Sequence, residues 1–268
     1  MIAGTNSGCG KTTVTCAVLQ ALVNRKINVS SFKCGPDYID PMFHKTVIGT
    51  AAYNLDTYLM SNDAVNYLLN KNSGDIAVIE GVMGFYDGFS FTEKGSTHEL
   101  SEITDTDVIL VVNCRGMSLS AMALVKGFKE FRKNNIKCVI FNNLPEKLYG
   151  NLAEKCRKIG LTPLGFLPNI KDVQISSRHL GLVTAGEIDG IKDKMNLLAD
   201  YAEKYIDIDK ILEISENDRD TKFTSPEITK KYNVKIAVAY DRAFCFYYED
   251  NLNLLSEMGA EIIKFSSA

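Results

Sequence analysis

A run of small, glycine-rich residues near the start of the chain could hold phosphate groups. It reads Gly4-Thr5-Asn6-Ser7-Gly8-Cys9-Gly10-Lys11-Thr12-Thr13 and opens a helical pattern. In such a loop the backbone N–H groups point into one concavity at a helix N-terminus, whose partial positive charge favours an anion. Lys11 is then placed to reach the β- and γ-phosphates, and Thr12 to ligate Mg²⁺. The predicted nucleotide-binding residues here are Ser7, Gly8, Gly10, Lys11, Thr12 and Thr13.

This loop departs from the usual phosphate-loop pattern at one position. In G-x-x-x-x-G-K-[ST] the first glycine would fall at position 5, where this chain has Thr5, and Gly4 stands one residue early. The alternative is a plain Gly/Ser turn before a core helix. The apolar residues before the loop and the helical pattern after it favour the phosphate loop.

Charged side chains follow the expected second strand. Residues 28–33 run into Lys33, Asp37, Asp40 and His44 within twelve residues. Functional groups of doubly wound folds gather at the carboxyl ends of the strands, so this cluster indicates Mg²⁺ and substrate handling. The alternative is a structural loop, because Gly-Pro-Asp and Asp-Pro are both good turn sequences.

Another acidic position follows a later strand. Residues 76–79 end at Glu80, a place where nucleotide-binding folds put a second contact to the metal. Residues 81–88 contain three glycines, which permit close backbone approach to a ligand, and include Asp87 as a further acid. A strand capped by a solvated acid is the alternative.

The histidines are His44, His98 and His179, each in a polar, glycine-containing stretch. That setting favours ligand contact over core packing. We expect His44 and the Arg178-His179 pair to contact an anionic substrate, and the sequence assigns no role to His98. Their wide separation does not indicate a shared metal site.

The composition is that of an ordinary globular chain. It has 268 residues, 46% hydrophobic and 24% charged, and a net charge of −3 gives no reason to expect nucleic acid as a partner. No apolar run is long enough for a bilayer and no signal-peptide layout is present, so we expect a cytoplasmic protein without membrane contact. The seven cysteines are never spaced C-x-x-C, which indicates buried thiols rather than disulfides or a zinc site.

Short β-branched runs alternate with helix-period stretches. This predicts an α/β fold with a P-loop and a doubly wound parallel sheet. The strand before the phosphate loop has only residues 1–3, so either the start of the chain is trimmed or that strand is misassigned. The other expected strands are 28–33, 76–79, 108–112, 139–141 and 164–167, and the expected helices are 11–25, 64–69, 118–133 and 152–159.

The composition changes after residue 205. Residues 206–233 are charged and indicate a helix followed by an interdomain linker. Residues 234–268 then predict one βαβ unit, with strands at 234–239 and 261–265 around a helix at 249–258. A lone unit cannot enclose a core, so we expect it to be the truncated start of a second α/β domain.

Several strings together resemble one family over almost the whole chain. They are Phe32-Lys33-x-Gly35-Pro36-Asp37-Tyr38-Ile39-Asp40-Pro41, Asn54-Leu55-Asp56, residues 79–88, residues 178–182 and residues 237–248. The chain resembles the cobyrinic acid a,c-diamide synthases, and its last string resembles the beginning of their glutamine amidotransferase domain.

The resemblance implies an enzyme, an amidoligase. In that family a domain similar to dethiobiotin synthetase binds ATP and Mg²⁺, and a class I glutaminase domain supplies ammonia. ATP phosphorylates the a and c acetate carboxylates of cobyrinic acid or a related tetrapyrrole, and ammonia displaces the phosphate, in cobalamin biosynthesis. Residues 1–205 would be the ATP-binding domain and 234–268 the start of the amidotransferase domain. The family's nucleophilic cysteine lies beyond residue 268, so we expect no glutaminase activity from this sequence.

Roles for single residues also follow from the resemblance. Thr12, Asp37 and Glu80 would ligate Mg²⁺, while Ile39, Asp40 and Asp87 would organise the substrate carboxylate, the acyl phosphate and ammonia. Asn142 falls where dethiobiotin-synthetase-like folds contact the base. His98 stands where the family usually has a small residue, which puts substrate fit nearby in question. The expected catalytic residues are Lys11, Asp37, Asp40, Glu80 and Asp87.

Three other families with this fold are alternatives. Partition-type regulatory ATPases carry a signature lysine where this chain has Asn6. Dethiobiotin synthetases lack a counterpart of residues 237–248, and cobyric acid synthases carry Gln-Asn-Met in place of residues 35–37. The sequence does not distinguish cobyrinic acid from its hydrogenated metal-free relative or a nickel sirohydrochlorin. A homodimer is compatible with it.

Overall fold

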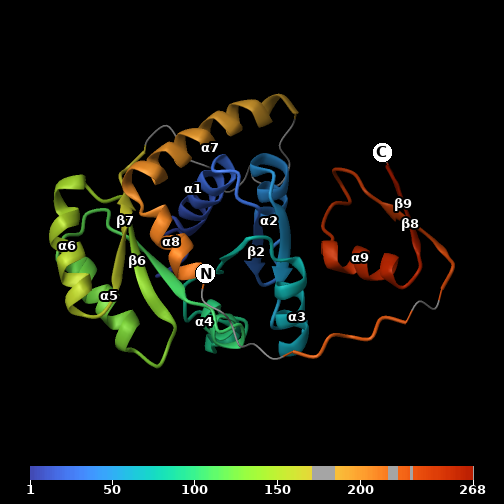
Figure 1. The fold of residues 1–268 in the computed structure, drawn as a ribbon, viewed down its shortest axis with the longest axis horizontal. Coiled ribbons are helices and arrows are strands. Elements are labelled where there is room, and N and C mark those ends of the chain that lie inside the picture. Colours follow the sequence, from blue (N-terminus) through green and yellow to red (C-terminus); the bar gives the residue numbers. More distant parts are fainter. Residues whose placement is uncertain (171–184, 217–222, 230–231, 268) are drawn as a thin grey trace.

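A seven-stranded parallel sheet forms the centre of the larger domain (Figure 1). The computed structural model describes residues 1–170, 185–216, 223–229 and 232–267. The strand order is β3-β2-β4-β1-β5-β6-β7, and every neighbouring pair is parallel. The strands are β1 (Ile2–Gly4), β2 (Val29–Cys34), β3 (Ala51–Leu55), β4 (Ile76–Glu80), β5 (Val108–Asn113), β6 (Ile136–Asn142) and β7 (Thr162–Leu167).

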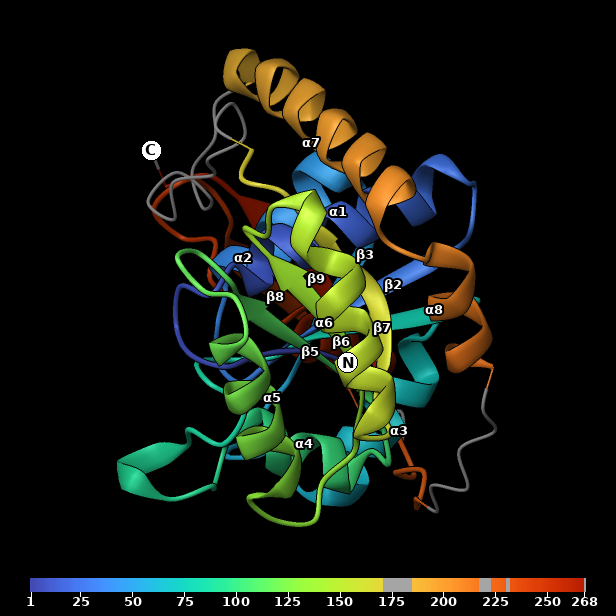
Figure 2. The same cartoon turned by 90° about the vertical axis from the view of Figure 1, so that its left-hand side faces the viewer.

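Helices cover both faces of this sheet (Figures 1 and 2). One core lies between the sheet and α1 (Lys11–Asn24), η1 (His44–Ile48), α7 (Ala185–Tyr205) and α8 (Ile208–Ser215). The core on the other face includes side chains from α3 (Asn62–Asn72), α4 (Thr97–Ile103), α5 (Ser120–Glu130) and α6 (Glu146–Lys158). Two short elements, α2 (Ile39–Phe43) and η2 (Phe89–Phe91), lie in the loops. The predicted doubly wound α/β fold is therefore confirmed.

The strand β3 was not predicted. The strands that were predicted agree with the structure to within a few residues. Its sequence, Ala-Ala-Tyr-Asn-Leu, has little of the β-branched character that marks a strand. Backbone pairing with β2 from Ser30↔Ala51 to Cys34↔Leu55 stabilises it instead. The expected first strand is β1, which has three residues and pairs with β5. The predicted buried thiols are also confirmed, since six of the seven cysteines are buried and all are free.

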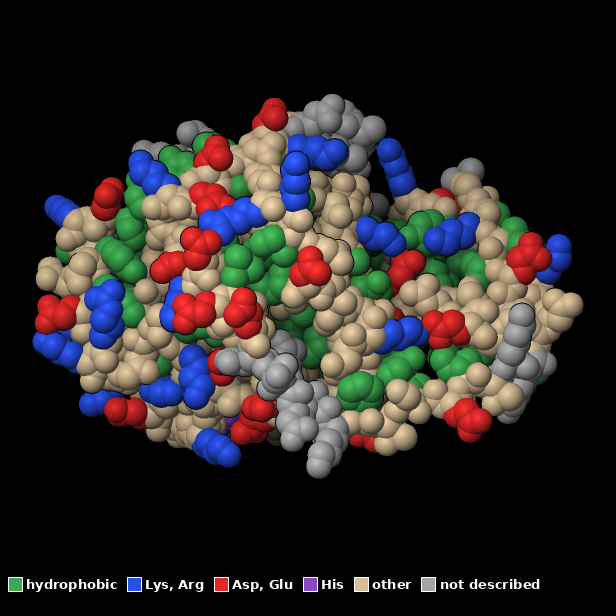
Figure 3. Space-filling model, in the orientation of Figure 1, with side chains coloured by type: hydrophobic (Ala, Val, Ile, Leu, Met, Phe, Trp, Pro, Cys, Tyr) green, Lys and Arg blue, Asp and Glu red, His purple; other side chains and the backbone are tan. Residues whose placement is uncertain are grey.

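A second, two-stranded parallel sheet forms a smaller unit. Its elements are β8 (Lys235–Ala239), α9 (Glu249–Glu257) and β9 (Glu261–Phe265), as the sequence predicts. Figure 3 shows this unit as a separate lobe with apolar side chains on its surface, and Ile263 and Phe265 are among those exposed. Its buried Tyr248 and Leu252 come from the loop and helix between the strands.

The smaller unit is joined to the larger domain by polar contacts. The Tyr248 hydroxyl donates a hydrogen bond to Asp56 Oδ2 at 3.0 Å, and Asn72 Nδ2 donates to Asp250 Oδ1 at 2.8 Å. Two ion pairs add to them, Lys45–Glu249 at 2.9 Å and Lys71–Glu257 at 2.5 Å. Residues about two hundred positions apart in sequence therefore meet at β3, η1 and α3.

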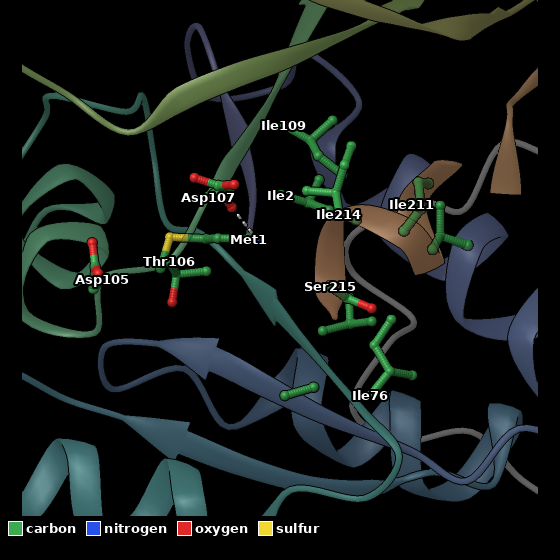
Figure 4. Close-up of a pocket in the computed structure, with 13 residues that line it drawn as sticks. Met1, Ile2, Ile76, Asp105, Thr106, Asp107, Ile109, Ile211, Ile214 and Ser215 are labelled. Atoms are coloured by element: carbon green, nitrogen blue, oxygen red, sulfur yellow. Dashed lines mark hydrogen bonds between the residues drawn. The ribbon is translucent and has the colours of Figure 1, made fainter. Parts of the chain in front are cut away.

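A cavity of about 340 Å³ lies at the amino edge of the larger sheet. In Figure 4 the side chains of Ile2, Ile109, Ile211 and Ile214 gather in it, and the Met1 amine donates to Asp107 O at 2.8 Å. Its lining combines aliphatic side chains with Asp105, Thr106, Asp107 and Ser215, and it lies away from the carboxyl edge, where functional groups of doubly wound sheets gather. None of the described helices combines the length and apolar composition needed to cross a bilayer.

Replacing Tyr248 with phenylalanine should weaken the attachment of the smaller unit. A hydrogen bond to a carboxylate contributes about 1.5–3 kcal/mol, so Tyr248→Phe should lower the free energy of unfolding by that order. Burial and the hydrogen bond to Asp56 raise the pKa of Tyr248 above its ordinary value of 10.0. The contribution is therefore present below pH 10 and is lost as the pH rises further, because the unfolded phenol ionises first.

Urea unfolding of wild type and variant between about pH 8 and pH 11 measures this difference. Tyr247→Phe is the matched control, because the Tyr247 hydroxyl donates to Ala239 O within the smaller unit and is exposed. Equal stabilities of wild type and Tyr248→Phe at the lower pH would contradict the expectation.

Candidate active site

The phosphate loop joins β1 to α1 at the carboxyl edge of the sheet. Gly8 and Gly10 have φ angles of 78° and 94°, which favour glycine. No side chain caps the amino end of α1 at Gly10, and its first turn has no acidic residue. The first N–H groups of the helix thus have no side-chain cap, and their binding of an anion stays a prediction.

Asn142 holds this loop from the end of β6. Its side-chain Nδ2 donates to Cys9 O at 2.9 Å, and both residues are buried. A Cβ on Gly10 would come within 1.9 Å of the same nitrogen, so the contact requires a glycine there. The amide nitrogen of Asn142 is therefore engaged by the loop, while its contact with a nucleotide base stays a prediction.

The segment after β4 packs against the phosphate loop. Phe85 N donates to Gly4 O at 2.8 Å, and a Cβ on Gly84 would lie 3.1 Å from Thr5 O. A Cβ on Gly81 would likewise meet the Thr97 side chain at 2.6 Å. Gly81 and Gly84 thus let the backbone approach neighbouring protein atoms closely. The sequence analysis had suggested that the close approach would be to a ligand.

Lys33 lies at the centre of a buried cluster of acids. Its Nζ contacts the Asp40 carboxylate, lies 3.1 Å from Glu80 Oε1 and lies 3.5 Å from Asp37 Oδ2. The register of β2 and β4 places Lys33 opposite Glu80. Lys33 is 3% exposed and Glu80 is fully buried. Asp37, Asp40 and Glu80, which the sequence analysis singled out, thus all lie close to Lys33. The sequence analysis gave Lys33 no separate role.

The charges in this cluster stabilise one another. Burial lowers the pKa of Lys33, but Glu80, Asp40 and Asp37 outweigh it and leave the pKa raised. Burial raises the pKa of Glu80, yet the positive charges of Lys33 and Lys11 hold that pKa below its ordinary value. Both groups are therefore charged at neutral pH.

Thr12 and Glu80, two predicted ligands of Mg²⁺, lie in direct contact. Thr12 Oγ1 donates to Glu80 Oε1 at 2.6 Å, and Glu80 Oε2 has no hydrogen-bond partner among the described residues. Hydroxyl and carboxylate oxygens suit Mg²⁺, which binds through one or two protein groups together with phosphate oxygens. The described residues contain no cluster of three or more metal-binding side chains. The residues present therefore fit Mg²⁺ bound with a nucleotide.

The other predicted acids occupy distinct positions. Asp37 Oδ1 accepts from Ile39 N at 2.9 Å and so begins α2, leaving Oδ2 toward Lys33. Asp87 is exposed, and its Oδ2 accepts from Gly84 N at 3.1 Å. Lys11 is 9% exposed and forms no ion pair within the described part of the chain, which suits a side chain reserved for phosphate.

The expectation that His44 and His98 lie in polar loops is wrong. Both lie in helical elements and are buried, because tertiary packing covers them although a charged residue, Lys45 or Glu99, follows each in sequence. His44 Nε2 is 3.5 Å from Glu80 Oε2, and burial lowers the pKa of its imidazole. His98 Nε2 lies 3.1 Å from Lys133 O, and its ring packs edge-on against Phe85. Arg178 and His179 fall outside the described residues.

A hollow of about 490 Å³ opens beside the Lys33 cluster. Asp37 belongs to its lining and to the cluster. One wall comes from Phe246 of the smaller unit, a residue that sequence analysis did not single out as part of a site. The remaining lining residues are Cys34, Pro36, Tyr38, Ile39 and Val82.

Residues 1–183 match the family described as the CobQ/CobB/MinD/ParA nucleotide binding domain. The chain belongs to this family. The predicted P-loop nucleotide-binding domain is therefore confirmed.

Curated relatives are similar over nearly the whole chain. The cobyrinate a,c-diamide synthase of Thermoplasma volcanium is 43% identical over 99% of this chain and 59% of its own length. That of Methanocaldococcus jannaschii is 41% identical over 99% of this chain and 62% of its own length. The chain thus spans about three-fifths of these relatives. Among solved structures, the MinD cell division protein of Aquifex aeolicus matches 76% of this chain and 96% of its own at 15% identity, with a TM-score of 0.46.

Removing the lysine at the centre of the site should destabilise the domain. Lys33→Met leaves Asp40 and Glu80 buried without a counter-charge, and breaking a buried pair in this way costs about 3–5 kcal/mol. Without Lys33, burial raises the pKa of the Glu80 carboxyl, so that protonation removes part of the unpaired charge as the pH falls toward about pH 5. The loss in free energy of unfolding should be largest at neutral pH and smaller in mild acid.

Urea unfolding of both proteins at neutral and mildly acidic pH checks this expectation. Lys126→Met, which removes an exposed pair with Glu130, is the matched control and should change stability little. A Lys33→Met deficit that is the same at both pH values would argue against an electrostatic origin.

Proposed function

We propose that this chain activates carboxylates of a tetrapyrrole with ATP, as the first half of cobyrinate a,c-diamide synthesis. The observation that carries the proposal is the junction of Thr12, Glu80 and Lys33, which joins the phosphate loop to the acidic segment after β2. The chain's similarity to curated cobyrinate a,c-diamide synthases supports the choice of acceptor.

A carboxylate must be activated before ammonia can attack it. Its oxygen is a poor leaving group, so one carboxylate oxygen first attacks the γ-phosphorus of ATP and ADP leaves. Ammonia then attacks the carbonyl carbon of the acyl phosphate, inorganic phosphate departs, and a proton is lost from nitrogen. Such phosphoryl transfer needs positioning and charge neutralisation more than covalent help from the protein.

The residues of this chain divide between the two reacting partners. The N–H groups at the start of α1 and Lys11 would bind the triphosphate, and Thr12 with Glu80 would hold Mg²⁺. Mg²⁺, when bound, neutralises charge on the β- and γ-phosphates. Lys33 keeps Glu80 ionised and fixes its carboxylate in place.

The acceptor would lie on the side of Asp37. We assign Asp37 to the acceptor rather than to the Mg²⁺ role that the family resemblance implies, because its oxygens contact Ile39 N and Lys33 Nζ. Asp37 lines the hollow at the end of β2, and Ile39 lines it too. Asp40 is held against Lys33, and Asp87 caps the turn at Gly84 next to the phosphate loop. We assign these residues to orienting the acceptor carboxylate and ammonia. Glutamine as the source of ammonia, and the a and c acetates as the sites of amidation, are part of the same proposal.

Glu80→Gln should abolish ATP-dependent amidation. The amide keeps the shape of the side chain but removes the charge that would hold Mg²⁺ and that pairs with Lys33. We expect the rate to fall by at least about a hundredfold, as when one electrostatic contact to a transition state is removed. ADP release and amide formation are measured with cobyrinic acid, ATP and ammonium chloride, which makes glutamine unnecessary.

The matched control is Glu130→Gln, at an exposed position in α5. It should react at the wild-type rate, and thermal unfolding should show that both variants fold. Turnover by Glu80→Gln equal to that of wild type would overturn the proposed role of this carboxylate.

Asp37→Asn and Asp87→Asn separate the acceptor side from the metal site. Both variants should bind ATP with Mg²⁺ as wild type does, because neither side chain contacts Thr12 or Glu80. Amidation should nevertheless be strongly reduced. Titration calorimetry with ATP and Mg²⁺, beside the amidation assay, distinguishes the two effects. Loss of nucleotide affinity in Asp37→Asn would instead place that residue among the Mg²⁺ ligands.

A further inference from the structure

The smaller unit places an aromatic stack at the mouth of the hollow beside Asp37. Tyr38 stacks with two rings of that unit: its ring centroid is 5.1 Å from that of Phe246 at an interplanar angle of 12°, and 5.1 Å from that of Tyr248 at 29°. Tyr38 and Phe246 both line the hollow. Phe246 is 55% exposed, so much of its surface remains free.

We propose that Phe246, backed by Tyr38, forms a stacking wall for the conjugated part of a tetrapyrrole macrocycle, so that the smaller unit completes the acceptor site of the larger domain. This inference rests on the proposed function and specifies where its acceptor lies. Aromatic rings pair favourably with other conjugated rings in offset-stacked arrangements. A macrocycle edge lying along this wall brings its carboxylate arms to Asp37, and Asp37 Oδ2 is 3.5 Å from Lys33 Nζ.

The dimensions of the hollow favour an edge rather than a whole macrocycle. Its volume of about 490 Å³ and its mostly apolar lining suit one pyrrole ring with its side arms. The rest of the macrocycle would lie outside, over the exposed surface of Phe246. Amidation of peripheral acetates requires this kind of presentation, because one arm at a time must reach the phosphoryl donor.

The position of Phe246 is fixed by its neighbours in the smaller unit. Two residues later, Tyr248 donates to the buried Asp56 carboxylate, whose other oxygen accepts from the Tyr58 and Leu59 N–H groups. Glu249, the residue after Tyr248, forms an ion pair with Lys45 of the larger domain. The wall is therefore built before the acceptor arrives, which lowers the entropic cost of binding.

Phe246→Ala tests the stacking wall. In the 268-residue chain, binding of cobyrinic acid is followed by the change in its visible absorbance, and the KM for it is measured in the amidation assay with ammonium chloride. We expect the acceptor Kd and KM to rise roughly tenfold, the order of a lost aromatic pair together with its buried area. The affinity for ATP should not change, since Phe246 does not contact the phosphate loop.

Three matched variants make the test specific. Phe244→Ala removes an aromatic ring of the same loop that is 50% exposed and does not line the hollow, and it should bind cobyrinic acid like wild type. Phe246→Trp keeps a stacking surface and should retain affinity. Phe246→Leu fills apolar volume without stacking and should resemble Phe246→Ala.

The outcomes separate this inference from the proposed function. A wild-type chain that does not bind cobyrinic acid overturns the proposed function, and this inference with it. If wild type binds it and Phe246→Ala or Phe246→Leu binds equally well, the stacking wall alone is overturned, and the carboxylate-activation site is unaffected.

Discussion

The ion pair between Lys33 and Glu80 is the interaction on which the rest of the site depends. Both side chains come from neighbouring strands in register and point to the sheet face that α1 and η1 cover. Neither charge could stay in so buried a position alone, because the cost of removing an ion from water is repaid only by an opposite charge held close to it. Thr12 and His44 then reach Glu80 from two different helices. One strand register therefore fixes where the phosphate loop, the acidic segment and the carboxylate meet.

Hydrogen bonds from several elements hold the phosphate loop in place. Asn142 binds it from β6, Phe85 binds it from the segment after β4, and Thr12 ties the first turn of α1 to Glu80. These contacts use backbone or short side-chain groups, which have little freedom to move. A loop fixed before its ligand binds keeps its N–H groups oriented, and such preorganisation is what phosphoryl transfer requires of a protein.

Much of the larger domain could be predicted from the sequence, because buried parallel strands are short apolar runs and functional side chains follow their carboxyl ends. Glu80, Asp37 and Asp40 were found in this way. The pairing of Lys33 with Glu80 could not be predicted, because it depends on the order of the strands in the sheet. That order places β4 between β2 and β1. The strand β3 and the burial of His44 depend on tertiary contacts that local composition does not carry. The contribution of Phe246 requires a contact across about two hundred residues of chain.

The charge of the site supports the proposal that a divalent cation binds there together with the nucleotide. Around Glu80, the side chains of Lys11 and Lys33 face three carboxylates, and burial keeps His44 neutral, so one net negative charge remains. Such a site by itself repels both a triphosphate and an acceptor carboxylate. The N–H groups of α1 offset part of this at one end only, because the field of a helix falls off within its first turn. The Thr12 hydroxyl and the Glu80 carboxylate would therefore suit a cation that arrives with the nucleotide, and the proposed apolar wall at Phe246 would let the acceptor bind largely through its ring rather than through its charge.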